Sequence, residues 1–157
     1  MHNVTDIPIG LHKAILNSIP YGILVANKDG KFIFWNEVTY KTFKKELINS
    51  EQQNWVDDWG VFSVDKKTKY QTEEVPLSRA LRGEIVTGEK LCISTEGRPC
   101  VFIKVSAFPI WTKEGEIEAG IVVFDDITKE QTMYDNILQK IGELENYLKN
   151  HLMTKDE

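Results

Sequence analysis

Short runs of alternating apolar and polar residues fill the middle of the chain, whereas apolar residues recur at helical spacing near both ends. Residues 11–18 have this helical spacing and are followed by Pro20, which favours the end of a helix. Residues 21–26 and 32–35 are apolar and rich in strand-forming residues, and the Asp-Gly pair within 27–30 favours a tight turn. The pattern therefore predicts a flanking helix followed by a β-hairpin.

Helical signals follow the hairpin. Asn36 is suited to cap a helix that runs to about residue 45, with Val38, Phe43 and Leu47 on its apolar side. A second helix is expected over residues 76–82, since it begins with a proline and is followed by a glycine.

The segment between these two helices, residues 49–74, mixes aromatic residues with polar and turn-forming ones. This mixture predicts short helical turns that cover an apolar surface, not one regular element.

Three further strands are expected at residues 86–94, 101–108 and 117–125, joined by turns with an acidic residue before glycine. The middle strand alternates clearly: Val101, Ile103, Val105 and Ala107 share the core face, whereas Phe102, Lys104 and Phe108 fall on the other. That outer face is partly apolar, so it requires cover from the N-terminal helix or from a second subunit.

Residues 21–26 and 119–124 are apolar on both faces, as expected of neighbouring strands in the middle of a sheet. The resulting order predicts an α+β fold: a five-stranded antiparallel sheet with helices over one face, an N-terminal flanking helix and a C-terminal coiled-coil-like helix.

The last part of the chain has an apolar residue every seven positions. The stripe comprises Ile127, Tyr134, Ile141 and Leu148, with Ile137 and Leu144 between them. One interpretation is an amphipathic helix packed back on its own domain, but a helix of roughly twenty-five residues would extend about 37 Å. A parallel dimeric coil is therefore favoured, although Gly142 and His151 weaken it. Thr128 and Gln131 fit a capping box at its start.

Composition narrows the function. The 157 residues carry a formal net charge of -5, which repels phosphate backbones and argues against nucleic acid as a partner. With no leader-like start and no apolar run of about eighteen residues, no membrane segment is expected and the chain is predicted to be cytoplasmic. Phosphate-binding loops, clustered metal ligands and a central histidine base are all lacking, so neither a metal site nor catalysis is expected.

Cys92 and Cys100 fall on adjacent predicted strands, and the length of the loop between them decides whether they face each other. Buried, inert and reduced thiols are the favoured interpretation, and a redox switch is the alternative.

Large aromatic residues gather in the segment that is expected to cover the sheet. They could line a pocket for an apolar or planar ligand, or they could form ordinary core. The candidate lining residues are Trp35, Tyr40, Phe43, Trp55, Trp59, Phe62, Leu81, Ile103 and Val105.

Three strings in this order resemble PAS domains of bacterial and archaeal sensor kinases: SIPYGILVANKDGKFIFWN at 18–36, EVPLSRALRGE at 74–84 and GIVVFDDITKEQ at 120–131. The resemblance implies a flanking helix at 1–19, a PAS sensor domain at 20–128 and a signalling helix at 129–157. Asp126, Ile127 and Thr128 resemble the signal-relay tripeptide of the family.

The resemblance also implies a regulatory sensor module that binds a small molecule or cofactor and passes changes through its flanking helices to an output kinase or another signalling domain. The heptad stripe predicts that the module is a homodimer. The ligand stays unknown. The sequence argues against haem because His2, His12 and His151 lie outside the sensor core, and against covalently linked flavin because its cysteine motif is lacking. The alternatives are a protein-interaction domain without ligand and, less favoured, a small enzyme.

Overall fold

The computed structural model describes residues 7–44, 50–95 and 97–152. Two predictions concern residues outside these ranges: Leu47 on the apolar side of the helix after Asn36, and Glu96 in the turn before residue 101. The chain forms two compact units, Met1–Asp126 and Ile127–Glu157.

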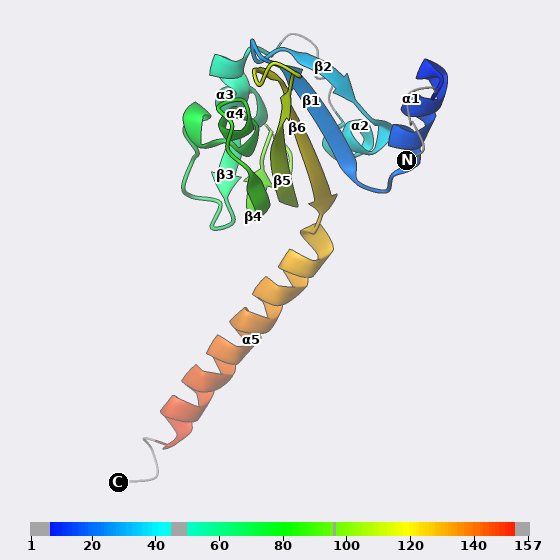
Figure 1. Ribbon diagram of the computed structural model, residues 1–157. Coiled ribbons are helices and arrows are strands. Elements are labelled where there is room, and N and C mark those ends of the chain that lie inside the picture. Colours follow the sequence, from blue (N-terminus) through cyan, green and yellow to red (C-terminus); the bar gives the residue numbers. More distant parts are fainter. Residues whose placement is uncertain (1–6, 45–49, 96, 153–157) are drawn as a thin grey trace. The chain divides into compact units, whose positions relative to one another are not determined.

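The first unit is built on one antiparallel sheet (Figure 1). Its strands are β1 (Gly22–Asn27), β2 (Phe32–Trp35), β3 (Val61–Ser63), β4 (Val86–Ile93), β5 (Val101–Trp111) and β6 (Ile117–Asp126). They lie in the order β2-β1-β6-β5-β4-β3, so β1 and β6 are neighbours and both are interior strands, as their two-sided apolar pattern predicts.

The sheet has six strands, whereas the sequence predicts five. The additional strand, β3, is only three residues long and pairs with β4. It follows Gly60, whose φ of 58° turns the chain out of α3 (Trp55–Trp59). So short a strand at a sheet edge leaves too little alternation to be recognised.

Short helices cover one face of the sheet. They are α2 (Glu37–Phe43), α3, α4 (Pro76–Ala80) and the single 3-10 turns η1 (Gln52–Asn54) and η2 (Thr72–Glu74). Figure 1 shows α3 and α4 beside β3 and β4. Asn36 caps α2 as predicted, since its side chain accepts a hydrogen bond from Thr39 N. Gly83 takes φ +93° just beyond α4, a conformation that favours glycine.

The core lies between this helical layer and the sheet. Ile103, Val105 and Ala107 point into it from β5, as the alternating pattern predicts, and Val122 and Phe124 do so from β6. Trp55 and Trp59 of α3 and Leu77 of α4 close it from the helical side. Gly120 of β6 leaves the room that Leu77 requires, because a Cβ there would lie 3.0 Å from a Leu77 methyl.

The outer face of the sheet is more fully covered at one end than the pattern suggests. Phe102 is only 2% exposed although it points away from the main core. The Nζ atom of Lys66 lies over its ring, 5.0 Å from the centroid, in a cation–π arrangement. Phe108 on the same face stays 37% exposed, so cover is still lacking over this part of β5.

The N-terminal flanking helix, α1 (Ile9–Ser18), has no buried residue. Leu11 and Ile15, two members of its apolar stripe, are about half exposed. Its last turn is attached to the sheet unit through polar contacts, because Asn36 Nδ2 donates to the carbonyl oxygen of Leu16 at 3.2 Å.

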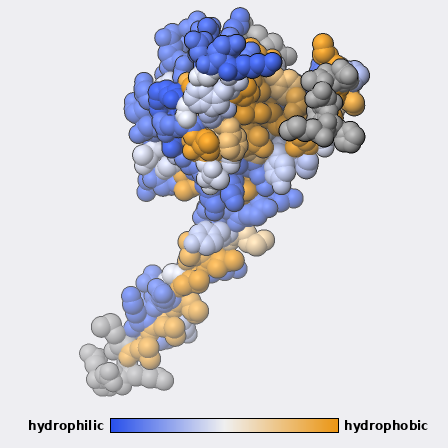
Figure 2. Space-filling model, viewed as in Figure 1, coloured by the Kyte–Doolittle hydropathy of each residue, from blue (hydrophilic) through white to orange (hydrophobic). Residues whose placement is uncertain are grey.

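The second unit is one helix, α5 (Thr128–Leu152), of 25 residues without a buried side chain. Figure 2 shows its apolar residues gathered in a stripe along the helix. The predicted seam residues are all about half exposed; they are Tyr134, Ile137, Ile141, Leu144 and Leu148.

Gln131, a residue of the predicted capping box, makes two contacts at the start of α5. The backbone N–H of Gln131 donates to the carbonyl oxygen of Ile127 at 2.9 Å, which makes Ile127 the residue that accepts the first helical hydrogen bond. The Gln131 side chain turns forward and donates to Asp135 at 3.0 Å.

Candidate functional site

An apolar cavity of about 80 Å³ lies between the helical layer and the sheet. Its walls come from both layers and contribute no polar surface from the described part of the chain. The lining residues are Leu24, Phe32, Phe43, Trp55, Trp59, Val61, Val75, Pro76, Leu77, Leu91, Ile93, Ile103, Val105, Val122 and Phe124.

Aromatic rings hold the helical wall in place. Phe43, near the end of α2, meets Trp59 edge to face at 5.7 Å between centroids and Phe124 of β6 at 5.0 Å. On the other side, Phe32 of β2 stacks on Trp55 of α3 at 5.0 Å. Such pairs contribute about 0.5–1.5 kcal/mol beyond burial. Phe43 therefore connects α2 with α3 and β6 at the cavity wall.

Five of the nine predicted pocket residues line this cavity: Phe43, Trp55, Trp59, Ile103 and Val105. The other four lie elsewhere. Trp35 borders a second groove, of mixed polar and apolar lining, beside the β1–β2 turn, and Tyr40 is 49% exposed on α2. Phe62 is paired with Cys92 on the outer face of the sheet, and Leu81 packs at the edge of the core.

Most of the lining that the prediction missed comes from strands. Leu24, Val61, Leu91, Val122 and Phe124 point inward at every second position. Period-two alternation could have found those of β4 and β6, because Leu91 and Ile93, or Val122 and Phe124, share a face. Phe62 was wrongly placed because a three-residue strand gives no such period.

The size and chemistry of the cavity restrict what it can hold. Pockets for drug-sized ligands measure roughly 300–1,000 Å³, and an apolar cavity of about 150 Å³ binds benzene or xenon. A volume of about 80 Å³ without polar lining therefore suits an apolar species of a few heavy atoms. A charged or strongly polar ligand would be left without hydrogen bonds.

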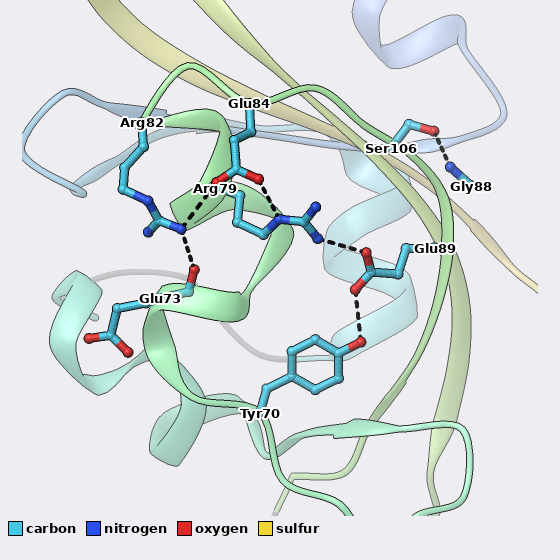
Figure 3. A network of polar contacts seen from close by, with 8 residues as sticks. All are labelled: Tyr70, Glu73, Arg79, Arg82, Glu84, Gly88, Glu89 and Ser106. Atoms are coloured by element: carbon cyan, nitrogen blue, oxygen red, sulfur yellow. Dashed lines mark hydrogen bonds and ion pairs between the residues drawn. The ribbon is translucent and has the colours of Figure 1, made fainter.

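A polar network ties α4 to β4 outside the cavity (Figure 3). The guanidinium of Arg79 donates to Glu84 and to Glu89, each at 2.9 Å. The hydroxyl of Tyr70 donates to the second oxygen of Glu89 at 2.8 Å. Arg82 donates to the carbonyl oxygen of Glu73 at 2.7 Å. Together these contacts hold η2, α4 and β4 in one frame.

The same network shifts ionisation. Burial, followed by the hydrogen bond to Glu89, holds the pKa of Tyr70 well above its usual value. The hydrogen bond from Arg79 lowers the pKa of Glu84, while that contact raises the pKa of Arg79. Tyr70 therefore remains a neutral hydrogen-bond donor over the physiological pH range.

The cavity is joined to α5 through the chain itself. Val122 and Phe124 of β6 line it, and β6 continues through Asp126 and Ile127 into Thr128, the first residue of α5. Asp125 and Asp126 occupy consecutive positions of β6, opposite Lys104 and Ile103, so their side chains point to different faces.

Cys92 and Cys100 form a disulfide, which corrects the expectation of reduced, separate thiols. The β4–β5 register pairs Cys92 with Phe102 and Ile93 with Val101, so the two cysteines are diagonal neighbours on the outer face. Their Cα atoms are 5.8 Å apart, within the range that a disulfide spans. The sequence pattern does not show where β4 ends and β5 begins. It therefore leaves the length of the turn between them, and with it this register, open.

None of the helices within residues 7–44, 50–95 and 97–152 is both long and apolar enough to cross a membrane.

The combination of an antiparallel sheet in this strand order, a helical layer and an apolar core defines an α+β fold. The model of the PAS domain family matches residues 20–129, which is more than half of the chain. The chain belongs to the PAS domain family. PAS domains are sensor modules of signal-transduction proteins and are generally not catalytic.

Solved structures agree with this fold. A PAS domain from Colwellia psychrerythraea is 16% identical with a TM-score of 0.55, covering 77% of this chain and 98% of its own. The PAS domain of nitrogen regulation protein NR(II) from Vibrio parahaemolyticus is 17% identical with a TM-score of 0.53, covering 74% and 98%. The PAS domain of an HTR-like protein from Haloarcula marismortui is 14% identical with a TM-score of 0.51, covering 75% and 90%. A search of curated protein sequences gave no match.

Proposed function

We propose that this chain is a homodimeric PAS input module that responds to a small apolar ligand and relays the response through α5 to an output domain, such as a kinase, in the same or another chain. The observation that carries the proposal is the continuity of β6: Val122 and Phe124 line the cavity, and the same strand leads directly into α5. A change in the cavity wall therefore has a short covalent path to the signalling helix.

The dimer is supported by the exposed seam of α5. Ile141 is 48% exposed, and its seam neighbours one turn away are also exposed. A helix of 25 residues is about 37 Å long, and heptad seams of this kind are covered by a second helix in coiled coils. A second copy of the chain supplies a seam with the same pattern.

Sedimentation velocity tests this dimer with a matched pair of variants. Ile141→Glu places a charge in the seam, so it should convert the dimer to a monomer. Asn136→Glu adds the same charge on the polar side of the helix and one turn before Lys140, so it should leave the dimer intact. A wild-type chain that sediments as a monomer at all concentrations would contradict the dimer.

Xenon tests the relay because it suits a small apolar cavity. Under xenon pressure, chemical shifts of cavity methyl groups should move, and the dimer dissociation constant should change in the same titration. Thermodynamic linkage requires both effects if the cavity and α5 are coupled. Binding without a change in dimerisation would reject the relay but keep the cavity site.

A second candidate is a PAS interaction domain without ligand. The small volume of the cavity and the aromatic packing of Phe43 against Trp59 and Phe124 favour it. Native mass spectrometry of freshly purified protein, compared with the denatured mass, separates the two functions. A bound small molecule supports sensing, and an unliganded dimer whose cavity excludes xenon supports the interaction domain.

A further inference from the structure

The disulfide closes a short hairpin loop that reaches from the sheet to α2. Cys92 lies in β4 and Cys100 directly precedes β5, eight positions later. Within the loop, the N–H of Arg98 donates to the carbonyl oxygen of Thr95 at 3.0 Å, and Gly97 has a φ of +71°. A covalent link at the base of such a loop restricts the conformations of the residues inside it.

Arg98, which lies inside this restricted loop, contacts the end of α2. Its Nη1 donates to the carbonyl oxygens of Phe43 at 3.0 Å and Lys44 at 3.2 Å. These are the last carbonyls of α2, where Lys44 adopts a left-handed conformation with φ 51°. A cation at a helix C-terminus satisfies unpaired carbonyls and interacts favourably with the helix dipole. Arg98 and Phe43 are 55 positions apart in sequence, so local chain geometry does not bring them together. The contact forms only when the loop is held beside the end of α2.

Phe43 connects this contact to the cavity, since its carbonyl accepts from Arg98 and its ring packs on Trp59 and Phe124. We propose that Cys92 and Cys100 are a thiol–disulfide exchange site for low-molecular-weight thiols, and that its redox state sets the order of the end of α2 and of the adjoining cavity wall.

The two sulfurs differ in access. Cys92 is 1% exposed, whereas Cys100 is half-buried at the base of the loop, so an external thiolate reaches Cys100. Attack forms a mixed disulfide on Cys100, breaks the bond to Cys92 and releases the Cys92 thiolate, which takes up a proton. A second thiolate attacks the external sulfur, releases the low-molecular-weight disulfide and leaves Cys100 to be protonated. Two thiols are oxidised and the protein disulfide is reduced, so electrons and protons balance.

Disulfides in reducing compartments are usually transient and redox-sensing. Oxidised protein should hold α2 through Arg98, and reduced protein should release it. Because a hydrogen bond to a charged group contributes on the order of a tenfold change in a local equilibrium, reduction should speed amide exchange at the end of α2 by roughly tenfold.

The test uses the full chain equilibrated with glutathione and oxidised glutathione at several ratios. Alkylation under denaturing conditions followed by intact mass should show no adducts at the oxidising end and two at the reducing end. Hydrogen exchange over residues 37–44 should follow the same transition. Two adducts at every ratio would overturn the exchange site.

Three variants assign the coupling. Cys100→Ser, at the less buried sulfur, should exchange like reduced wild type at every ratio. Arg98→Ala should keep the alkylation transition but lose the redox response of α2. Arg82→Ala, which removes an arginine from a different contact, should retain both. Identical exchange in oxidised and reduced wild type would overturn the coupling, and neither readout depends on dimerisation or on a ligand.

Discussion

The side-chain oxygen of Asn36 accepts the backbone N–H of Thr39 at 3.1 Å and lies 2.9 Å from its hydroxyl. Both residues are buried, at 1% and 0% exposure. The same oxygen accepts from Ile23 N at 3.0 Å, and the amide group donates to the carbonyl oxygens of Tyr21 and Leu16. Asn36 thus connects α1, β1 and α2, and both its side-chain oxygen and its amide group are used in these contacts.

Asn36→Ala should be among the most destabilising single substitutions. It removes an N-cap, worth about 1 kcal/mol, and leaves buried partners unsatisfied at about 1–3 kcal/mol each. We expect a loss of about 3 kcal/mol or more in the free energy of unfolding, measured by urea denaturation.

Asn36→Asp separates the two roles of this side chain. Aspartate keeps the oxygen that caps α2 but has no donor for Leu16 and Tyr21, so amide exchange in α1 should rise while α2 stays protected. Equal exchange of both helices in this variant would contradict the division of roles.

Phe43 and Tyr40 form a matched pair on α2. Phe43→Ala should enlarge the cavity and cost about 3 kcal/mol of unfolding free energy, within the range for such truncations. Tyr40→Ala should cost less than about 1 kcal/mol because its ring is half exposed and outside the cavity. Thermal unfolding with added benzene is the decisive measurement, since only the Phe43 variant should be stabilised by it.

Gly142 weakens α5 in the middle of its seam. No atom would lie within 4 Å of a Cβ at this position, so Gly142→Ala is free of steric conflict. The substitution should favour the helix by about 0.8–1 kcal/mol per chain. Circular dichroism should show more helix, and sedimentation equilibrium should show a tighter dimer. A destabilised dimer would mean that position 142 lies inside a close helix contact.

Tyr70 should titrate above the ordinary tyrosine pKa of about 10 in an ultraviolet absorbance titration. Its raised pKa means that the folded state favours the neutral phenol, so its contribution to stability is complete below the ordinary tyrosine value of about 10 and is lost as pH rises further. Tyr70→Phe should remove this titration step, whereas Tyr40→Phe should leave it unchanged.

The elements that local chemistry determines were predictable from the sequence. The side-chain oxygen of Asn27 accepts from the N–H groups of Asp29 and Lys31 within the first hairpin turn, so both of these contacts span four positions or fewer. The inward positions of β5 also follow from its alternation. These features depend on neighbours in the chain, so no tertiary contact was needed to infer them.

Relationships across the fold were not predictable. The contact of Arg98 with α2 joins residues that are distant in sequence, and nothing in the local pattern of either segment indicates it. Whether the two cysteines meet depends on the register of β4 and β5. A shift of one residue in that register would place the two side chains on opposite faces of the sheet. The cavity volume depends on how all the rings pack together, and such packing is a property of the complete core.

The position of β6 has a consequence for how the protein is made. β1 is translated early, yet its central partner, β6, is the last strand of the sheet. Until β6 has left the ribosome, the N-terminal hairpin and the β3–β5 strands have no strand to join them. Sheets that depend on such distant pairing form slowly. Nascent chains interrupted before residue 117 should therefore remain protease-sensitive, because the pairing that unites the two halves is made by the final strand.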